Sequence, residues 1–195
     1  MVLNEREMEV ILRVKSGDGE AFSLLVDAYA DRIFGYLNLM VKNRSDAEEI
    51  SQEVFIKAYR GLCKFRADCP FAPWLFRIAR NEAINFSRRH KRQGLLAADR
   101  NPDLPPLEPV DVSDGPLEQM LDRERRKEAR RLIAALDEKY RTVLTLRYGE
   151  GLSYREIAGV IGAPEGTVKT LLHRAKAKLR RTATSELTVE AAPAG

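Results

Sequence analysis

The second half of the chain contains a basic segment whose residue types suit contact with a nucleic acid. Between Thr167 and Thr182 there are six Lys or Arg residues and no acidic residue. Cationic side chains along one face of a helix can neutralise phosphates and reach base edges in a major groove. The segment therefore favours a DNA-binding helix over the alternative, a solvated basic face on an ordinary amphipathic helix.

Two short helices joined by a tight turn would position this charge. Ser153 and Glu156 have the spacing of a capping box, which predicts where the first helix begins. Gly162 suits its end, because glycine adopts a left-handed conformation at low cost, and Pro164 suits the first position of the second helix. This pattern predicts a helix-turn-helix. Its second helix has an apolar stripe at helical spacing, made of Val168, Leu171, Leu172, Ala175 and Leu179.

A second basic face is expected on a helix from Trp74 to Lys91, with Pro73 in its first turn. One side of this helix is apolar, and the other has Arg and Asn side chains. Cations that follow a backbone, together with flat groups that hold bases, suit single-stranded nucleic acid. The alternative is a basic helix end without a specific partner. The polar side includes Arg77, Arg80, Asn81, Arg88 and Arg89.

An acidic and polar strip is expected on the outward face of the preceding helix, from Ser45 to about Leu62. Ser45 and Glu48 have the spacing of a second capping box. The residue types by themselves indicate only a solvated face. The strip consists of Asp46, Glu49, Gln52 and Glu53.

The whole chain of 195 residues is predicted to be all-α, with two helical domains joined by an extended linker. Residues 1–92 form the first domain, with further helices over 5–16 and 20–42. Residues 93–117 hold five of the nine prolines, five acidic residues and one basic residue, which indicates a Pro-rich acidic linker. Residues 118–182 form the second domain, with a helix to about Leu136 and a short one around Val143. Residues 183–195 are expected to be a disordered tail.

No enzyme is predicted. The sequence has no phosphate-binding glycine loop, no nucleophile elbow and no metal-ligand spacing, and no cofactor is expected. Cys63 and Cys69 have neither a redox spacing nor His partners, so two reduced thiols are expected. No segment has the ~20 apolar residues needed to span a bilayer, and no signal peptide is seen. A cytoplasmic protein without membrane insertion is therefore expected.

Three segments together resemble bacterial sigma factors of the extracytoplasmic-function (ECF) type, in the sigma-70 family. These are DAEEISQEVFIKAYRGL, FRADCPFAPWLFRIARNEAINFSRR and the run from LDEKYRTVL to HRAKAKL. The resemblance covers residues 8–92 and 118–182 in order. It implies a sigma-2 domain and a sigma-4 domain that bind core RNA polymerase and promoter DNA. Such factors are usually held by an anti-sigma factor and are nucleoid-associated when in the holoenzyme.

The resemblance also implies roles for individual residues. The acidic strip would dock on the clamp helices of the polymerase β′ subunit, and the second domain would meet the β flap. A loop and helix would capture and hold the melted −10 element through Phe65, Arg66, Asp68, Arg77, Arg80, Asn81, Arg88 and Arg89. The −35 element would be read by Lys169, Thr170, His173 and Arg174, with Arg155 and Lys178 on phosphates. Leu171 departs from the family pattern, so no base contact is expected there.

A stand-alone helix-turn-helix regulator is the alternative function. Its first domain would sense a ligand or form a dimer. The basic fourth helix and the acidic strip argue against it, because a sensor domain needs neither.

Overall fold

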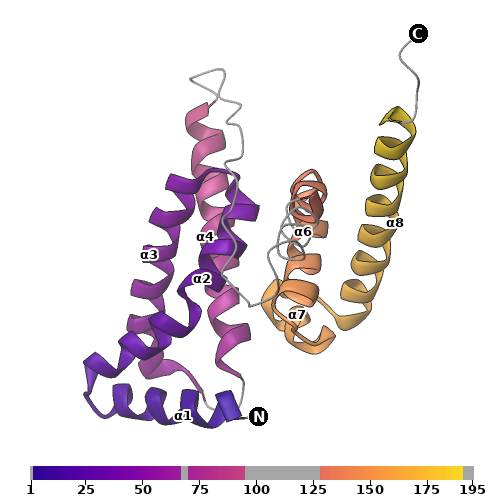
Figure 1. The fold of residues 1–195 in the computed structure, drawn as a ribbon. Coiled ribbons are helices and arrows are strands. Elements are labelled where there is room, and N and C mark those ends of the chain that lie inside the picture. The colour runs from indigo at the N-terminus through magenta and orange to yellow at the C-terminus, as the bar shows by residue number, and fades with distance from the viewer. Residues whose placement is uncertain (1, 67–69, 95–127, 191–195) are drawn as a thin grey trace, which may run out of the picture.

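The computed structural model describes residues 2–66, 70–94 and 128–190, and these residues contain helices and no strand. Figure 1 shows an N-terminal bundle beside a C-terminal unit of helices. The bundle consists of α1 (Val2–Lys15), α2 (Phe22–Val41), α3 (Arg44–Gly61) and α4 (Phe71–Gly94). The C-terminal unit begins with helical residues 128–134 and continues with α6 (Glu138–Leu144), α7 (Tyr154–Ile161) and α8 (Glu165–Glu190). The all-α prediction is confirmed, while the predicted linker over 93–117 lies almost entirely outside the described residues.

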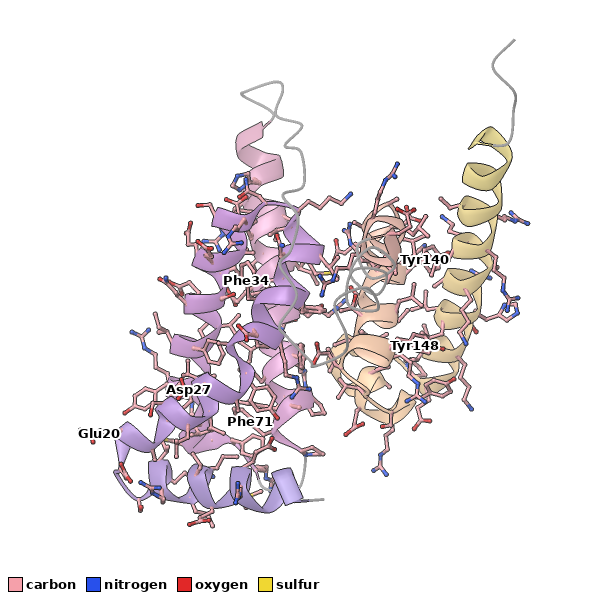
Figure 2. The ribbon with its side chains drawn as sticks, viewed as in Figure 1. Glu20, Asp27, Phe34, Phe71, Tyr140 and Tyr148 are labelled. Carbon is pink, nitrogen blue, oxygen red and sulfur yellow. The ribbon has the colours of Figure 1, made fainter. Side chains whose placement is uncertain are left out.

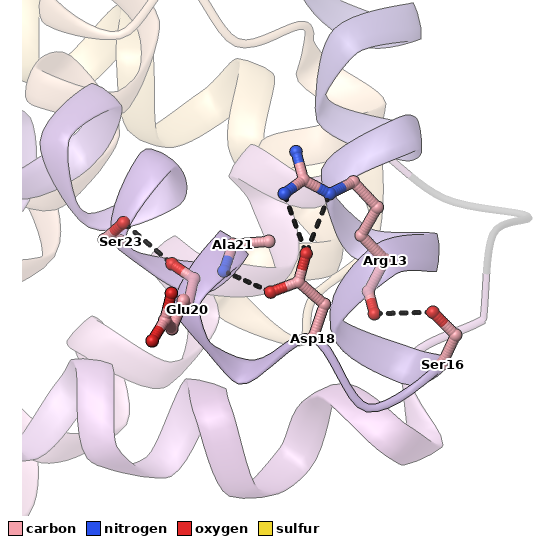
Figure 3. A network of polar contacts seen from close by, with 6 residues as sticks. All are labelled: Arg13, Ser16, Asp18, Glu20, Ala21 and Ser23. Carbon is pink, nitrogen blue, oxygen red and sulfur yellow. Dashed lines mark hydrogen bonds and ion pairs between the residues drawn. The ribbon is translucent and has the colours of Figure 1, made fainter.

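The turn between α1 and α2 is held by one carboxylate (Figure 3). Arg13 donates from Nε and Nη2 to Asp18 Oδ2, at 3.0 and 2.7 Å. Asp18 Oδ1 accepts from the Ala21 amide at 3.2 Å, which caps the single 3-10 turn Gly19–Ala21. Asp18 therefore ends one helix and begins the next, and the bond with Arg13 lowers the pKa of its carboxyl below the usual value.

The core of the bundle is aromatic and centres on α2. Tyr29 meets Phe71, the first residue of α4, edge to face, with ring centroids 5.4 Å apart. Figure 2 shows Phe71 at that end of the bundle. Tyr36 meets Phe76 in the same way at 5.5 Å. One face of α2 is apolar and buried, and it includes Leu25, Ile33 and Leu37. All residues from Tyr36 to Met40 are buried, because α6 also packs on this end of α2.

The start of α3 corrects the sequence prediction. The N-cap is Asn43, whose side-chain oxygen accepts from the Asp46 amide at 3.2 Å. Ser45 is already inside the helix, and Glu48 pairs with Arg44 at 3.0 Å instead of reaching back to a capping serine. Asn is as good an N-cap as Ser, and the left-handed Lys42 before it (φ 60°) ends α2 at that point. The tight α2–α3 turn therefore selects the earlier cap.

The helix-turn-helix forms as predicted, with small shifts. The capping box of Ser153 and Glu156 is present, and Gly162 ends α7 in the left-handed conformation at φ 67°. Pro164 lies one residue earlier than expected, just before α8, where its carbonyl accepts from the Thr167 amide at 2.9 Å. The stripe is buried at Val168, Leu172 and Ala175. Figure 2 shows the side chains of Tyr140 and Tyr148 beside α8.

Helix α8 extends into the segment 183–195 that the sequence predicts to be a disordered tail. There α8 continues through Glu190, and only 191–195 lie outside the described residues. Extending an existing helix costs no new nucleation, and no Gly or Pro interrupts the sequence before Pro193. An Ala/Thr-rich segment that would not form a helix alone can therefore continue α8.

A single wide turn links α6 to the helix-turn-helix. Residues Thr145–Gly149 form a π-helical turn, which the sequence analysis did not predict. The Leu152 amide donates to the Leu146 carbonyl at 3.0 Å, and Arg147 Nη1 donates to the Leu152 carbonyl at 2.8 Å. These bonds fix the direction in which the chain enters α7.

The two units pack against each other, mainly through α4 on α7 and α2 on α6 (Figure 1). Arg32 Nε donates to Glu150 Oε2 at 2.8 Å, and Arg141 Nη2 donates to the Met40 carbonyl at 3.4 Å. The buried side chains of both units form one continuous cluster. The two predicted helical domains therefore lie in direct contact in this structure.

Candidate nucleic-acid and protein interfaces

The first half of α8 presents its polar side chains to solvent. The four residues predicted to read the −35 element are all exposed: Lys169, Thr170, His173 and Arg174. They are exposed because the apolar stripe turns the opposite side of α8 into the core. Gly166 at the start of α8 has open space around its Cα, so a partner backbone could approach there. The arrangement suits insertion of this end of α8 into a major groove.

The two predicted phosphate contacts differ in their surroundings. Arg155 on α7 is exposed. Lys178 already donates to Asp137 Oδ2 at 2.7 Å and lies 4.9 Å from the centroid of the Tyr140 ring. Such an exposed ion pair is worth little, so a phosphate could replace the carboxylate. Leu171 is half-buried against the core, which agrees with its place in the apolar stripe.

The predicted −10 residues on α4 separate into two sets. Arg77, Asn81 and Arg88 are exposed, and their spacing of four and seven residues places them on one face of the helix. Arg89 is exposed beside them. Arg80 is half-buried and lies near the Tyr36 hydroxyl, on the side of α4 that is turned toward the C-terminal unit. In this arrangement Arg80 is less available to DNA than the other four residues.

The loop before α4 corrects one prediction. Phe65 is only 3 % exposed, with its ring 5.1 Å from Trp74 and 5.9 Å from Phe71. Its side chain belongs to the core and cannot contact a base without leaving it. The Phe65 carbonyl accepts from Lys15 Nζ at 2.6 Å, so the residue anchors the loop to α1. Arg66 is exposed, and Asp68 lies outside the described residues.

A polar pocket lies between α3 and α4 and was missed by the sequence analysis. Its volume is about 440 Å³, and its lining is Lys57, Glu82, Asn85, Arg88 and Arg89. Lys57 Nζ and Glu82 Oε2 are 2.5 Å apart. Because Lys57 and Glu82 belong to different helices and lie 25 residues apart, no local spacing could have revealed the pair. Only Arg88 and Arg89 were among the predicted residues.

The strip on α3 is at the surface as predicted. Glu49, Gln52 and Glu53 are exposed, while Asp46 is half-buried, and its amide donates to the Asn43 cap. Ile56, one turn after Gln52 on the same side, is 44 % exposed. This apolar neighbour was also missed, since periodicity alone does not show which isoleucines stay in solvent. An acidic strip with an exposed Ile suits docking on a protein better than solvation alone.

The remaining predictions concern absences and the cysteines. Among the described residues, no three His, Cys, Asp or Glu side chains gather as they would around a metal ion. None of the helices within the described ranges is long and apolar enough to cross a membrane. Cys63 is a free, exposed thiol, and Cys69 lies outside the described residues.

Comparison with known proteins assigns both halves of the chain. Residues 25–93 match sigma-70 region 2, and residues 126–179 match sigma-70 region 4. The chain is 37 % identical to the RNA polymerase sigma-H factor of Pseudomonas aeruginosa over 187 residues, which cover 90 % of this chain and 93 % of that protein. It is 37 % identical to the ECF RNA polymerase sigma factor SigW of Bacillus subtilis over 175 residues, or 88 % and 93 % of the two chains.

Solved structures share the fold at lower identity. The sigma factor RpoE of Bartonella quintana, in complex with the anti-sigma factor NepR, has a TM-score of 0.68 and 20 % identity, over 82 % of this chain and 94 % of that one. CnrH, in complex with the cytosolic domain of CnrY, has a TM-score of 0.65 and 24 % identity, over 90 % and 96 %. A stand-alone regulator is not supported, because the first half of the chain matches region 2. The chain therefore belongs to the sigma-70 family and is an RNA polymerase sigma factor of the ECF type.

Proposed function

We propose that three separate surfaces divide the work of promoter recognition. The start of α8 reads the −35 element as duplex, the face of α4 around Asn81 holds the −10 element as single strand, and the strip on α3 docks on core polymerase. The single observation that carries this division is the exposure of all three polar faces, each opposite an apolar side that builds the core. Each face keeps its polar groups free of core contacts, so each is available to a different partner.

The surfaces differ in the chemistry that they offer. Side chains on α8 such as Arg174 can form bidentate bonds with base edges in a major groove, each worth about 1–3 kcal/mol of discrimination. On α4, exposed Arg77, Arg88 and Arg89 can follow the phosphates of one strand, while the Asn81 amide can both donate to and accept from an unstacked base. The strip on α3 repels DNA and is suited to a basic protein surface.

Promoter recognition requires the two units to separate. Elements about 25 base pairs apart, at about 3.4 Å per base pair, lie about 85 Å apart along the duplex. A compact chain of this length has a radius of gyration of only about 16 Å. The two reading surfaces cannot therefore reach both elements while α4 packs on α7. The 25 residues of 93–117 could span about 80 Å when extended, so the connection permits the separation.

A protein that holds the units together would keep the factor inactive. Two relatives of the same fold were solved as complexes, one of them with an anti-sigma factor. We propose that this chain also has an anti-sigma partner, which would compete with core polymerase for the exposed surfaces. Co-purification of the chain with a partner that blocks transcription and is displaced by core polymerase would support this proposal.

The test of the proposed division is transcription from mapped start sites with purified core polymerase. Asn81→Ala is expected to impair open-complex formation and leave polymerase binding unchanged, because the amide contacts only melted DNA. Arg174→Ala is expected to weaken −35 recognition by about 1–3 kcal/mol at one base position. Equal loss of polymerase binding in Asn81→Ala would refute the assignment of α4. A uniform loss over all −35 sequences in Arg174→Ala would make that residue a phosphate contact.

A further inference from the structure

The acidic residue Glu82 lies next to Asn81 on the most basic helix of the bundle, and its charge is unexpected there. Its side chain is only 9 % exposed, whereas the side chain of its ion-pair partner Lys57 is 45 % exposed. Removing a carboxylate from water is costly, and an apolar residue could join α3 to α4 without that cost. The position therefore calls for an explanation beyond helix packing.

The pocket beside Glu82 has the size and the polar groups of a binding site. A volume of about 440 Å³ is within the usual range for small-ligand sites, and it exceeds the space that one nucleobase needs. Lys57, Arg88 and Arg89 can only donate hydrogen bonds, Glu82 can only accept them, and Asn85 can do both. Arg88 and Arg89 suit phosphates beside a base that enters the pocket.

The carboxylate gives the pocket a preference among bases. Adenine and cytosine carry an amino group, N6 or N4, at the place where guanine and thymine carry a carbonyl oxygen, O6 or O4. An ionised carboxylate accepts a hydrogen bond from the amino group and repels the carbonyl oxygen. One oxygen of Glu82 is held by Lys57, which fixes the direction of the carboxylate.

We propose that the pocket between α3 and α4 receives one base of the single-stranded −10 region, and that Glu82 selects an amino base, adenine or cytosine, over a keto base. Lys57 is the positioning residue that orients the carboxylate. This inference rests on the proposed function, since it requires α4 to hold the melted strand. It goes beyond that proposal by assigning a specificity-determining residue and the class of base that it selects.

The experiment measures binding of single-stranded −10 oligonucleotides to the complete factor in complex with core polymerase. Each position is substituted in turn with all four bases, and affinity is followed by fluorescence anisotropy. At one position, adenine and cytosine are expected to bind about tenfold or more tightly than guanine and thymine. Glu82→Gln should abolish that preference, because an amide offers both a donor and an acceptor. Glu48→Gln is the matched control, since Glu48 is an exposed α3 carboxylate that pairs with Arg44 away from the pocket, and its profile should be unchanged.

Three outcomes distinguish the possible failures. If no oligonucleotide binds the complex more tightly than it binds core polymerase alone, the proposed function of α4 is wrong. If binding shows no preference for amino bases at any position, or if Glu82→Gln keeps the preference, the inference about Glu82 is overturned and the ion pair only joins two helices. If Glu82→Gln does not fold, as judged by circular dichroism, the wild-type factor is tested with 2-aminopurine in place of adenine. Moving the amino group away from Glu82 in this way should weaken binding about tenfold, and unchanged binding would overturn the inference.

Discussion

Two ion pairs with equally buried carboxylates hold together two different regions of this molecule. Lys57–Glu82 joins α3 to α4 inside the N-terminal bundle, and Arg32–Glu150 joins the bundle to the C-terminal unit. Each glutamate side chain is 9 % exposed. The surroundings of the two ion pairs differ in how well the buried groups are packed and hydrogen-bonded. Inside the bundle, apolar side chains such as Val54 and Ala58 are fully buried around the contact between the helices.

Between the two units, several polar groups remain poorly satisfied. The Tyr36 hydroxyl is buried near Thr142 without a well-formed hydrogen bond, and Arg141 Nε has no partner among the described residues. Each unmet buried group of this kind costs about 1–3 kcal/mol. Burial also raises the pKa of the Tyr36 hydroxyl and of the Glu150 carboxyl. The contact between the units is therefore less well satisfied than the bundle core, which agrees with the proposal that the units separate at a promoter.

The largest effect is expected inside the bundle. Leu75 is fully buried in α4, so Leu75→Ala should lower the free energy of unfolding by about 2–5 kcal/mol, from lost burial and the cavity left behind. Urea denaturation followed by circular dichroism measures the change. Leu12→Ala is the matched control, because Leu12 is 58 % exposed and its loss should change stability by less than about 0.5 kcal/mol. Similar losses in both variants would contradict the picture of a fully formed bundle core.

An intermediate effect is expected at the contact between the units. Arg32→Glu or Glu150→Arg alone should separate the two units, because each places like charges within the contact. The double variant restores opposite charges and should close the contact again. Small-angle X-ray scattering would show a larger radius of gyration for each single variant and a return to the wild-type value in the double variant. If the single variants stay as compact as the wild type, this ion pair does not hold the units together.

The smallest effect is a dependence of the same contact on pH. Burial raises the pKa of Glu150 above its usual value, despite the opposing influence of Arg32. A raised pKa means that the contact between the units favours the protonated carboxyl. The contribution of Glu150 to the stability of the contact is therefore complete below its usual pKa of 4.5, and it is lost as pH rises through the pKa that Glu150 has in the contact. The units should therefore be more often in contact at a pH below 4.5 than at neutral pH, as measured by energy transfer between dyes on α3 and α8. Glu150→Gln should remove this difference, and a difference that persists in that variant has another source.

The features predicted correctly from sequence depend on residues close together in the chain. The capping box at Ser153, the left-handed Gly162 and the stripe from Val168 to Ala175 each involve groups a few residues apart. One prediction that was wrong was also local, because two neighbouring residues could each cap the same helix. Asn43 is the N-cap of α3 in place of the predicted Ser45.

Contacts between helices could not be predicted in the same way. Phe65 was expected at a DNA surface and lies in an aromatic core, because the loop folds back against Trp74 and Lys15. Whether an aromatic residue in a loop faces inward depends on the helices that surround it, which spacing does not reveal. The half-buried state of Arg80 has the same origin, since it follows from a second unit packed on α4.

The sequence by itself determined the helices, the turn before α8, the basic and acidic faces and the family. Hydrogen bonds over three or four residues and apolar periodicity depend on residues close together in the chain, so they can be predicted from the sequence. Only the tertiary structure decided that Lys57 meets Glu82 and that Arg32 meets Glu150, 118 residues away. Those pairs depend on how whole helices rotate and pack. That rotation is set by the sum of many contacts across the core and by no single local pattern.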